Sequence, residues 1–357
     1  MPGPIDSKLL IRHESRGRAV YIHPDGSYYL SRHYVIYRSA DEGRSWTRVT
    51  RMPLPLGRRV AQASRLACRL LRHETKALTI LSDGTYVASN RDWVFRAQAG
   101  EPTMTPCRID DGGVPIWPPM SLTVGPGDRV LWGEYGGSKH NPRAVRIYSS
   151  DDRARSFEVA HTFKPAEIRH VHNLIYDADI RGYWVLVGDH DHEPGIGRLT
   201  EDLKSFDWVV KGEQRYRAVC MFDFGDRMVY GTDTEMEPNG LMSIEKATGR
   251  VQKLMDLEGS CIYACRFGGL YALTTTVEPS RVNACQDAVL WLSRDGQRWT
   301  RVFRAKKDRW HAVYFQFGSL VLPRGTGPHE TILFSGQALE GVDGKAIVAA
   351  VAPEAMI

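Results

Sequence analysis

Apolar and polar residues alternate in short runs along the whole chain, and residues 150–217 show the pattern most completely. Strands are predicted over residues 158–163, 174–176 and 183–187, because each run is rich in β-branched, aromatic or aliphatic residues and is bounded by a polar turn. A further strand precedes Thr200. We expect these four strands to form one antiparallel unit, with polar loops at one end and a structural turn at the other.

A polar turn recurs between such units. Residues 39–46 read Ser-Ala-Asp-Glu-Gly-Arg-Ser-Trp, and related turns begin at positions 150, 200 and 293. The aspartate side chain can accept backbone N–H groups within the turn, and the glycine can adopt a positive φ. The spacing of these turns indicates about seven units of roughly fifty residues each, which is the period of a β-propeller.

The predicted fold is therefore all-β, a single β-propeller domain over residues 1–357 with seven blades or, as an alternative, six. We expect residues 9–12 to close the ring by pairing with residues 346–351. The segment 60–71 is rich in Ala, Arg and Leu, and it predicts a short helical insertion between the first two units.

The recurring turns resemble the Asp boxes, or BNR repeats, of the sialidase-like β-propellers. Residues 39–46 fit the motif Ser-x-Asp-x-Gly-x-Ser/Thr-Trp completely, and looser copies spread over most of the chain. The resemblance implies that the turns join the third and fourth strands of a blade, on the face opposite the ligand site. The sequence lacks the Arg-Ile-Pro motif of sialidases proper. The resemblance is thus to the wider superfamily, which includes glycosidases, polysaccharide lyases and non-catalytic binders.

Charge narrows the range of partners. The formal net charge is +5 and arginine is frequent, which favours an anionic small partner. No run of Lys and Arg could follow a phosphate backbone, so we expect no nucleic-acid partner. No apolar run approaches the ~18 residues of a membrane span, and no signal peptide is visible. We expect a cytoplasmic protein without a membrane partner, and the sequence leaves the oligomeric state open.

Basic residues recur where inner strands are expected to begin. Similar segments occupy residues 16–20, 215–219 and 309–313, and residues 169–173 form a looser copy. Converging arginines need counter-charges, which either an anionic ligand or the carboxylates of neighbouring blades can supply. Together with a second set of loops on the same face, these segments give the substrate-binding candidates: Arg18, Arg32, Arg91, Glu134, Tyr135, Lys139, Arg215, Asp233, Trp310 and His311.

Four histidines stand in two His-x-His patterns, His170 with His172 and His190 with His192. Side chains two positions apart share one face of a strand, as metal ligands must, and neutral imidazole suits Mn, Fe, Ni or Zn. Alternatively, one histidine acts as a general acid or base, or all four are structural. The predicted cofactor is therefore either none or a divalent metal.

These candidates favour a lyase that acts on an acidic, uronate-containing oligosaccharide or polysaccharide. Arginines would neutralise the uronate carboxylate, a histidine would remove the C5 proton, and a tyrosine would protonate the leaving oxygen. The catalytic candidates are His140, His172, Tyr216 and Arg217.

Two other functions fit the same face. A glycoside hydrolase would use a carboxylate pair, such as Glu134 and Asp233, on either side of the scissile bond. A non-catalytic propeller would bind a glycan or a protein, with Trp117, Tyr135 and Trp310 stacking on sugar rings. An unsaturated product that absorbs ultraviolet light would identify the lyase.

Overall fold

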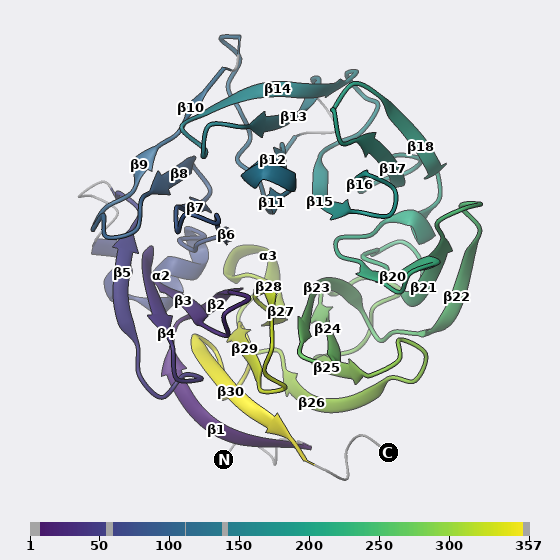
Figure 1. The fold of residues 1–357 in the computed structure, drawn as a ribbon. Helices are drawn as coiled ribbons and strands as arrows, with labels where there is room; N and C mark the ends of the chain where they lie inside the picture. The colour runs from purple at the N-terminus through teal and green to yellow at the C-terminus, as the bar shows by residue number, and fades with distance from the viewer. Residues whose placement is uncertain (1–7, 55–59, 111, 138–141, 353–357) are drawn as a thin grey trace.

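The strands form a ring of small sheets, which Figure 1 shows from one face. The structure is a computed structural model, and it describes residues 8–54, 60–110, 112–137 and 142–352. Neighbouring strands within each sheet are mostly antiparallel, and helices are few and short. The predicted all-β propeller class is therefore confirmed.

The strand groups follow one another around the ring in chain order. The first groups are β2 (Arg18–Ile22), β3 (Tyr28–Arg32), β4 (Val35–Ser39) and β5 (Thr47–Arg51), then β6 (Ala77–Ile80), β7 (Tyr86–Ser89), β8 (Val94–Ala97) and β9 (Thr105–Pro106), then β11 (Thr123–Val124), β12 (Val130–Gly133), β13 (Val145–Ser150) and β14 (Ser156–Phe163). β10 (Arg108–Ile109) adds to β14 in parallel.

The next groups are β15 (Val171–Asp177), β16 (Gly182–Val187), β17 (Gly195–Thr200) and β18 (Phe206–Lys211), then β19 (Phe222–Asp223), β20 (Arg227–Gly231), β21 (Gly240–Glu245) and β22 (Val251–Asp256), then β23 (Ser260–Phe267), β24 (Leu270–Val277), β25 (Asp287–Ser293) and β26 (Thr300–Lys306). The last comprises β27 (Gly318–Val321), β29 (Ile332–Gln337), β30 (Lys345–Val351) and β1 (Leu9–Arg16).

Strands from the two ends of the described chain meet in that last group. β1 pairs antiparallel with β30, from Leu9 opposite Val351 to Arg16 opposite Lys345. In addition, β28 (Arg324–Gly327) pairs in parallel with both β2 and β23, and β24 pairs with β27. These contacts join three groups into one 13-stranded sheet, so the number of blades stays a prediction.

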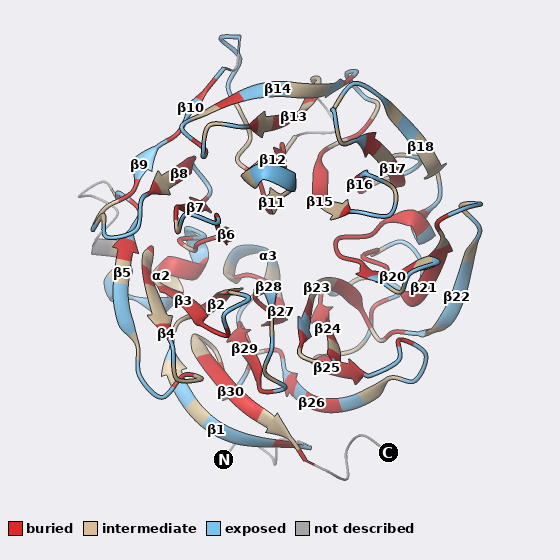
Figure 2. Ribbon diagram, viewed as in Figure 1, coloured by how far each residue is buried: buried red, intermediate tan, exposed pale blue. Residues whose placement is uncertain are grey.

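Burial follows the distance of a strand from the centre of the ring. Figure 2 shows outer strands such as β5 and β22 largely exposed, whereas strands nearer the centre are buried. The side chains of adjacent groups interlock. For example, the rings of Tyr29 in β3 and Tyr86 in β7 meet edge to face with centroids 6.2 Å apart, and both side chains are buried. This packing between groups holds the inner strands, and the loops at their ends, in fixed positions.

The polar turns join the third and fourth strands of their groups. Asp41 accepts hydrogen bonds from the backbone N–H and the hydroxyl of Ser45, and the Gly43 N–H donates to Ser39 Oγ at 2.8 Å. Gly43 has φ +87°, and a Cβ there would lie 2.7 Å from Val348, so both conformation and space require glycine. The turns at 150, 200 and 293 join β13 to β14, β17 to β18 and β25 to β26.

Two predicted strand assignments are wrong. The strand near 158–163 does not belong to the unit that follows it, because β14 pairs with β13 of the preceding group. The polar turn at 150 makes a hairpin of those two strands, and the chain crosses to the next group afterwards. Residues 309–313 do not begin an inner strand either, because Ala312–Phe315 forms the helix α3 and the inner strand β27 starts only at Gly318.

A short helical segment separates the first two groups. It consists of η1 (Val60–Ala63) and α2 (Arg65–Leu70), and the hydroxyl of Ser64 caps α2 by accepting from the Ala67 N–H. The buried guanidinium of Arg69 donates to the Phe315 carbonyl at 2.8 Å and pairs with Asp308, which fixes α2 against α3. None of the helices in the described ranges has the length and apolar character needed to cross a membrane.

Candidate functional site

A pocket of about 580 Å³ lies at the ends of the inner strands. Its residues come from inner strands such as β2, β23 and β27, from β28, from the loops between second and third strands, and from the segments that precede first strands. Because successive connections in an antiparallel group alternate between its two ends, these loops lie opposite the third-to-fourth strand turns. The pocket residues therefore share one face of the ring, and all the strand groups contribute to it.

Asp189, which follows β16, is the centre of a buried network. Its Oδ1 lies 3.3 Å from both His170 Nε2 and His172 Nε2, and its Oδ2 accepts from Arg169 Nη1 at 2.7 Å. Burial alone would raise the pKa of Asp189, but the two neighbouring histidines and the nearby Arg217 hold it well below its usual range. Asp189 is therefore ionised whenever the protein is folded near neutral pH.

Arg217, which precedes β19, connects Asp189 to two further carboxylates. Its guanidinium lies 2.9 Å from Asp189 Oδ1, 3.6 Å from Asp233 Oδ2 and 2.5 Å from Glu235 Oε2. Its side chain is only 7% exposed. Burial would lower the pKa of Arg217, but the three carboxylates outweigh it and raise that pKa. One guanidinium thus serves three carboxylates, which leaves this part of the pocket short of positive charge.

The shortage of positive charge shows in Asp233 and Glu278. Burial raises the pKa of Asp233, and one of its oxygens, Oδ1, is buried without a hydrogen-bond partner among the described residues. Burial, together with the charge of Asp233, raises the pKa of Glu278 to about 7. The hydroxyl of Ser260 donates to Glu278 at 3.1 Å. A carboxyl group with such a pKa can hold and release a proton at neutral pH.

Three further cations, Arg324, Lys76 and Arg91, line the pocket between β28 and β7, and of these Arg91 pairs with Asp92 at 4.0 Å. Arg324, in β28, makes no ion pair or hydrogen bond within the described ranges, and its burial lowers its pKa. Lys76, just before β6, lies 5.5 Å above the ring of Tyr135, and burial also lowers its pKa. Arg91 donates to the Leu71 carbonyl. The pocket thus has an acidic arc, from β16 to β24, and a basic arc, from β28 to β7.

Arg18 joins the two arcs through hydrogen bonds. Its guanidinium donates to Gln337 at 2.6 Å, to Tyr263 at 3.0 Å and to Glu74 at 3.3 Å. Burial would lower the pKa of Arg18, but Glu74 and Tyr263 raise it. Arg18 is therefore a fixed part of the pocket wall, with its charge already paired.

The donor atoms of His170, His172 and Asp189 are spaced as metal ligands are. The two Nε2 atoms lie 3.0 Å apart and each lies 3.3 Å from Asp189 Oδ1. A single ion could therefore lie ~2 Å from each of the three donor atoms, which is the usual length of a bond between a metal and a nitrogen or oxygen ligand. His172 Nδ1 donates to the Ala218 carbonyl, which leaves Nε2 with a lone pair. Burial lowers the pKa of His170 to about 4, so it is neutral. The donor set therefore fits a divalent metal.

The pocket brings together part of the predicted site. Arg18, Arg91, Tyr135, Arg217 and Asp233 all line it, as does the metal candidate His190. His170 and His172 lie behind Asp189 and do not line it. Tyr135 packs against both, with ring centroids 4.2 Å from His170 and 6.2 Å from His172.

The structure places the other predicted residues elsewhere. Glu134 is buried outside the pocket, where its carboxylate accepts from the Trp117 and Arg146 N–H groups and pairs with Arg143. The side chain of Arg143 also lies over the Trp117 ring, at 3.5 Å. Glu134 thus holds backbone in place, and hydrolysis by a Glu134–Asp233 pair has no geometric support.

Tyr216 and Arg215 point away from the pocket although Arg217 points into it. The Tyr216 hydroxyl donates to Glu213 at 2.7 Å, and Arg215 pairs with the same Glu213 at 2.9 Å. The remaining predicted residues that the structure describes do not line the pocket either: Arg32 lines a neighbouring pocket, His192 bonds to the Gly212 carbonyl, and Trp310 and His311 flank α3 on the surface. Lys139 and His140 lie outside the described residues.

Sequence reasoning missed several residues of the pocket. Asp189, Glu235 and Glu278 lie in loops that the pattern assigns to the correct face, and Arg324 begins the strand β28, but nothing in the sequence separates these four from solvated rim residues. Lys76 directly precedes the inner strand β6, so the rule of a basic residue before an inner strand would have found it.

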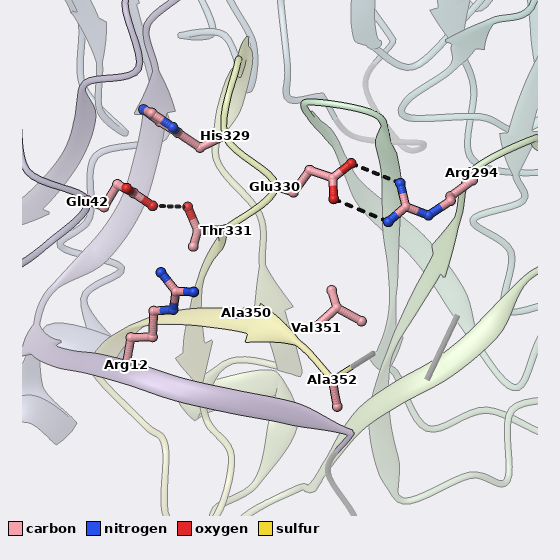
Figure 3. Close-up of a pocket in the computed structure, with 9 residues that line it drawn as sticks. All are labelled: Arg12, Glu42, Arg294, His329, Glu330, Thr331, Ala350, Val351 and Ala352. Atoms are coloured by element: carbon pink, nitrogen blue, oxygen red, sulfur yellow. Dashed lines mark hydrogen bonds and ion pairs between the residues drawn. The ribbon is translucent and has the colours of Figure 1, made fainter. Parts of the chain in front are cut away.

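A separate hollow lies near the polar turn at 39–46, away from the pocket described above. It measures about 340 Å³, and Figure 3 shows its residues, among them Glu42, Arg294 and Glu330. Glu42 accepts from the Thr331 hydroxyl, and Arg294 pairs with Glu330 at 2.8 Å. Because its carboxylates are paired and it adjoins a third-to-fourth strand turn, we assign this hollow to the scaffold.

A second acidic cluster is structural too. The ammonium group of Lys246 lies 2.8 Å from Asp177, 3.1 Å from Asp179 and 2.9 Å from Asp223. Burial alone would lower the pKa of Lys246, but its hydrogen bonds with the three aspartates raise it. The ammonium occupies the position that a cation would otherwise take.

Replacing Lys246 with methionine should lower the free energy of unfolding by about 2–3 kcal/mol, because Asp177 is then buried without its cation. Asp179 and Asp223 are more exposed and contribute less. Urea denaturation at neutral pH measures the loss. Lys253→Met removes an exposed ion pair and is the control, for which we expect a change of about 0.5 kcal/mol or less. Equal losses in the two variants would refute the structural role of Lys246.

No family model matches the sequence, and no curated protein matches it. Solved structures are similar in fold. The extracellular domain of BT4673 from B. thetaiotaomicron aligns with a TM-score of 0.59 and 9% identity over 98% of this chain, which spans only 42% of that one. An oligogalacturonate lyase in complex with manganese has a TM-score of 0.57 and 12% identity, covering 98% of this chain and 97% of its own. The GH74 enzyme of Niastella koreensis has a TM-score of 0.51 and 10% identity over 84% of this chain and 47% of its own.

At such identities the likeness concerns the fold. The neighbours show the β-propeller fold, and they leave the activity of this chain open.

Proposed function

We propose that the protein cleaves an acidic oligosaccharide, bound across the central pocket, by β-elimination at a uronate unit. The observation that carries the proposal is the division of the pocket. Arg324 lacks a carboxylate partner among the described residues, and it lines the same pocket as Glu278, whose pKa is about 7. A carboxylate-bearing sugar supplies the missing negative charge and places its glycosidic bond within reach of a protonated acid.

Each group in the reaction has a candidate on these two arcs. Arg324 and Arg91 would neutralise the uronate carboxylate and so make the C5 proton more acidic. Lys76, whose pKa is lowered by burial, would take that proton as a neutral amine. The electron pair left on C5 forms the C4–C5 double bond, the C4–O bond breaks, and the leaving oxygen takes the proton of Glu278. This assignment replaces His172 and Tyr216, which do not line the pocket.

A divalent metal, if bound, would be held by His170, His172 and Asp189, and it would add positive charge beside the substrate carboxylate. The similar fold of an oligogalacturonate lyase that binds manganese supports testing this metal. We also infer that the polar turns are Asp boxes, because four of them join third to fourth strands and in each the aspartate carboxylate accepts a backbone N–H of the turn.

Hydrolysis is the second candidate. It is favoured by the two neighbouring carboxyl groups with raised pKa, Asp233 and Glu278, beside the carboxylate of Glu235. One protonated and one ionised carboxyl group are what glycoside hydrolysis requires. A pure binding protein would use the same arcs without turnover.

One assay separates these functions. The purified protein is incubated with galacturonate oligomers, once after treatment with EDTA and once with added Mn²⁺. Release of an unsaturated product that absorbs ultraviolet light supports the lyase. New reducing ends without that absorbance support the hydrolase, and binding without either supports the binder. If no uronate oligomer binds with or without the metal, the proposal is wrong.

Arg324→Gln should weaken the binding of galacturonate oligomers about tenfold, which corresponds to the loss of one charge-assisted contact. It should not destabilise the fold, because Arg324 has no ion pair to lose among the described residues. Calorimetric titration and thermal unfolding measure the two effects. The control is Arg48→Gln, on the exposed outer strand β5, which should leave both unchanged. Unaltered affinity in Arg324→Gln would remove this residue from the site.

A further inference from the structure

A second pocket of about 600 Å³ lies next to the central one, on the same face of the ring. Its walls are the β1–β2 junction, the β3–β4 loop, the segment of η1 and α2, and the β29–β30 loop. The two pockets share three residues, Arg18, Glu74 and Gln337. These are the residues of the hydrogen-bonded wall, so one ridge of paired side chains separates two adjoining cavities.

The second pocket carries an excess of positive charge. The pocket contains the cations Arg16, Arg18, Arg32, Arg65 and Lys345, against two carboxylates, Glu74 and Asp343. Both carboxylates are already paired, Glu74 with Arg18 and Asp343 with Arg65 at 2.8 Å. Lys345 pairs with Glu14 at 3.0 Å.

Arg16 and Arg32 are the cations left over. In the part of the chain that the structure describes, neither has a carboxylate within ion-pair distance. Arg32 is held in place from two sides, because its Nε donates to the Arg16 carbonyl and its guanidinium lies 4.8 Å from the centre of the Tyr37 ring. The remaining nitrogens of Arg32 can therefore meet an anion without much loss of side-chain entropy.

The backbone between Arg16 and Arg18 explains how one segment serves both pockets. Gly17 has φ +139°, and a Cβ there would lie 2.9 Å from Leu30 and 3.1 Å from the Ser31 carbonyl. Only glycine allows this close turn. It places Arg16 in the second pocket and Arg18 in the shared ridge, so the two cavities are linked by the local conformation of three residues.

The remaining walls are polar and rigid. Ser31 and Thr75 share a hydrogen bond of 2.6 Å on one wall, and Ser335 lines another. Arg65 ties α2 to Asp343 across the pocket with two hydrogen bonds, and the buried Arg69 fixes the other side of the helix. Hydroxyl groups and fixed cations together suit a sugar that carries a negative charge, and the cavity is formed in advance of binding.

We propose that this second pocket, given the function proposed above, is a subsite for a further acidic sugar unit of the same oligosaccharide. The reacting uronate lies in the central pocket, the chain crosses the ridge of Arg18, Glu74 and Gln337, and the next carboxylate pairs with Arg16 and Arg32. The natural substrate class is then an acidic oligosaccharide of several units, and short oligomers bind less tightly because they leave the second pocket empty.

The test measures how affinity depends on chain length. Galacturonate oligomers of two to six units are titrated into the wild-type protein and into the double variant Arg16→Gln/Arg32→Gln, and binding is measured by calorimetry. We expect the longest oligomer to bind at least tenfold more tightly than the dimer to wild type, and we expect the variant to lose this gain while it keeps its affinity for the dimer. The control Arg44→Gln/Arg48→Gln removes the same charge from exposed positions and should keep the gain.

The possible failures are distinguishable. If wild type binds the dimer but gains nothing with length, or the double variant keeps the gain, the subsite is refuted and the proposed function stands. If wild type binds no galacturonate oligomer, both proposals fall. The single variant Arg16→Gln guards against misfolding, because the Arg16 side chain has no hydrogen bond or ion pair to lose among the described residues. Arg16→Gln should lose part of the increase in affinity with oligomer length, and its melting temperature should not change. If Arg16→Gln keeps the full increase, Arg16 does not belong to the subsite.

Discussion

Replacing Arg217 with methionine should lower the free energy of unfolding by about 3–5 kcal/mol at neutral pH, because it leaves buried carboxylates without their cation. Arg217 is 7% exposed and lies within 3.6 Å of Asp189, Asp233 and Glu235. Only Arg169 and the histidines would remain beside Asp189. Urea denaturation at pH 7.5 measures the loss.

The loss should shrink as the pH falls. Without Arg217 the pKa values of the buried carboxyl groups rise above those in the unfolded chain, so the folded variant takes up protons first and regains stability in acid. The neighbouring Arg215→Met is the matched control. Arg215 is about half exposed and pairs with Glu213 at the surface, so we expect a change of less than about 1 kcal/mol at either pH. If the two variants lose equal stability, Arg217 does not hold the network together.

Replacing Glu278 with glutamine should reduce kcat by about 10²–10⁴-fold on any acidic oligosaccharide that the protein cleaves, because the variant cannot donate a proton to the leaving oxygen. The pKa of Glu278 is about 7, so wild-type activity should fall above neutral pH as this group ionises. The variant should lack that alkaline limb and keep its affinity for the substrate. Glu330→Gln, at an exposed ion pair with Arg294, should change neither kcat nor the pH profile. A normal rate in Glu278→Gln would transfer the role of the acid to another group.

The same group has a predictable effect on stability. The pKa of Glu278 is about 7 in the folded protein and 4.5 for an ordinary glutamate, so the folded state binds the proton more tightly. Its contribution to stability is complete below about pH 4.5 and is lost as the pH rises through 7. Unfolding measured from pH 5 to 8 should therefore show Glu278→Gln gaining stability relative to wild type as the pH rises. A constant difference would mean that the pKa of Glu278 is not raised.

The fold could be predicted because its signals are local. Residues 39–46 form a turn through hydrogen bonds among Ser39, Asp41 and Ser45, and these depend on nothing outside the segment. The turn then fixes which end of each group carries the other loops. This alternation alone predicts that Arg18, Arg91 and Asp233 share one face, and all three line the central pocket.

The site could be predicted only in part, because burial and charge pairing arise between strand groups. Glu278 looks like an ordinary loop carboxylate, and its pKa is raised only by burial and by Asp233 from the neighbouring group. The sequence likewise does not show which way the chain turns at Tyr216. The short 3-10 turn Gln214–Tyr216 turns Tyr216 towards Glu213, whereas Arg217 enters the pocket. The prediction for Trp310 was wrong for a similar reason, because the helix α3 stands where an inner strand was expected.

The pairing of β1 with β30 affects how the polypeptide folds during synthesis. β1 leaves the ribosome long before its partner β30, from which it is separated by nearly all of the described chain. Until then β1 is an unpaired strand with Leu10 and Ile11 near its start, and even in the finished ring these side chains are 58% and 46% exposed. An unpaired edge strand can form β-pairs with other nascent chains. Slow translation, or truncation before β30, would therefore leave β1 prone to aggregation.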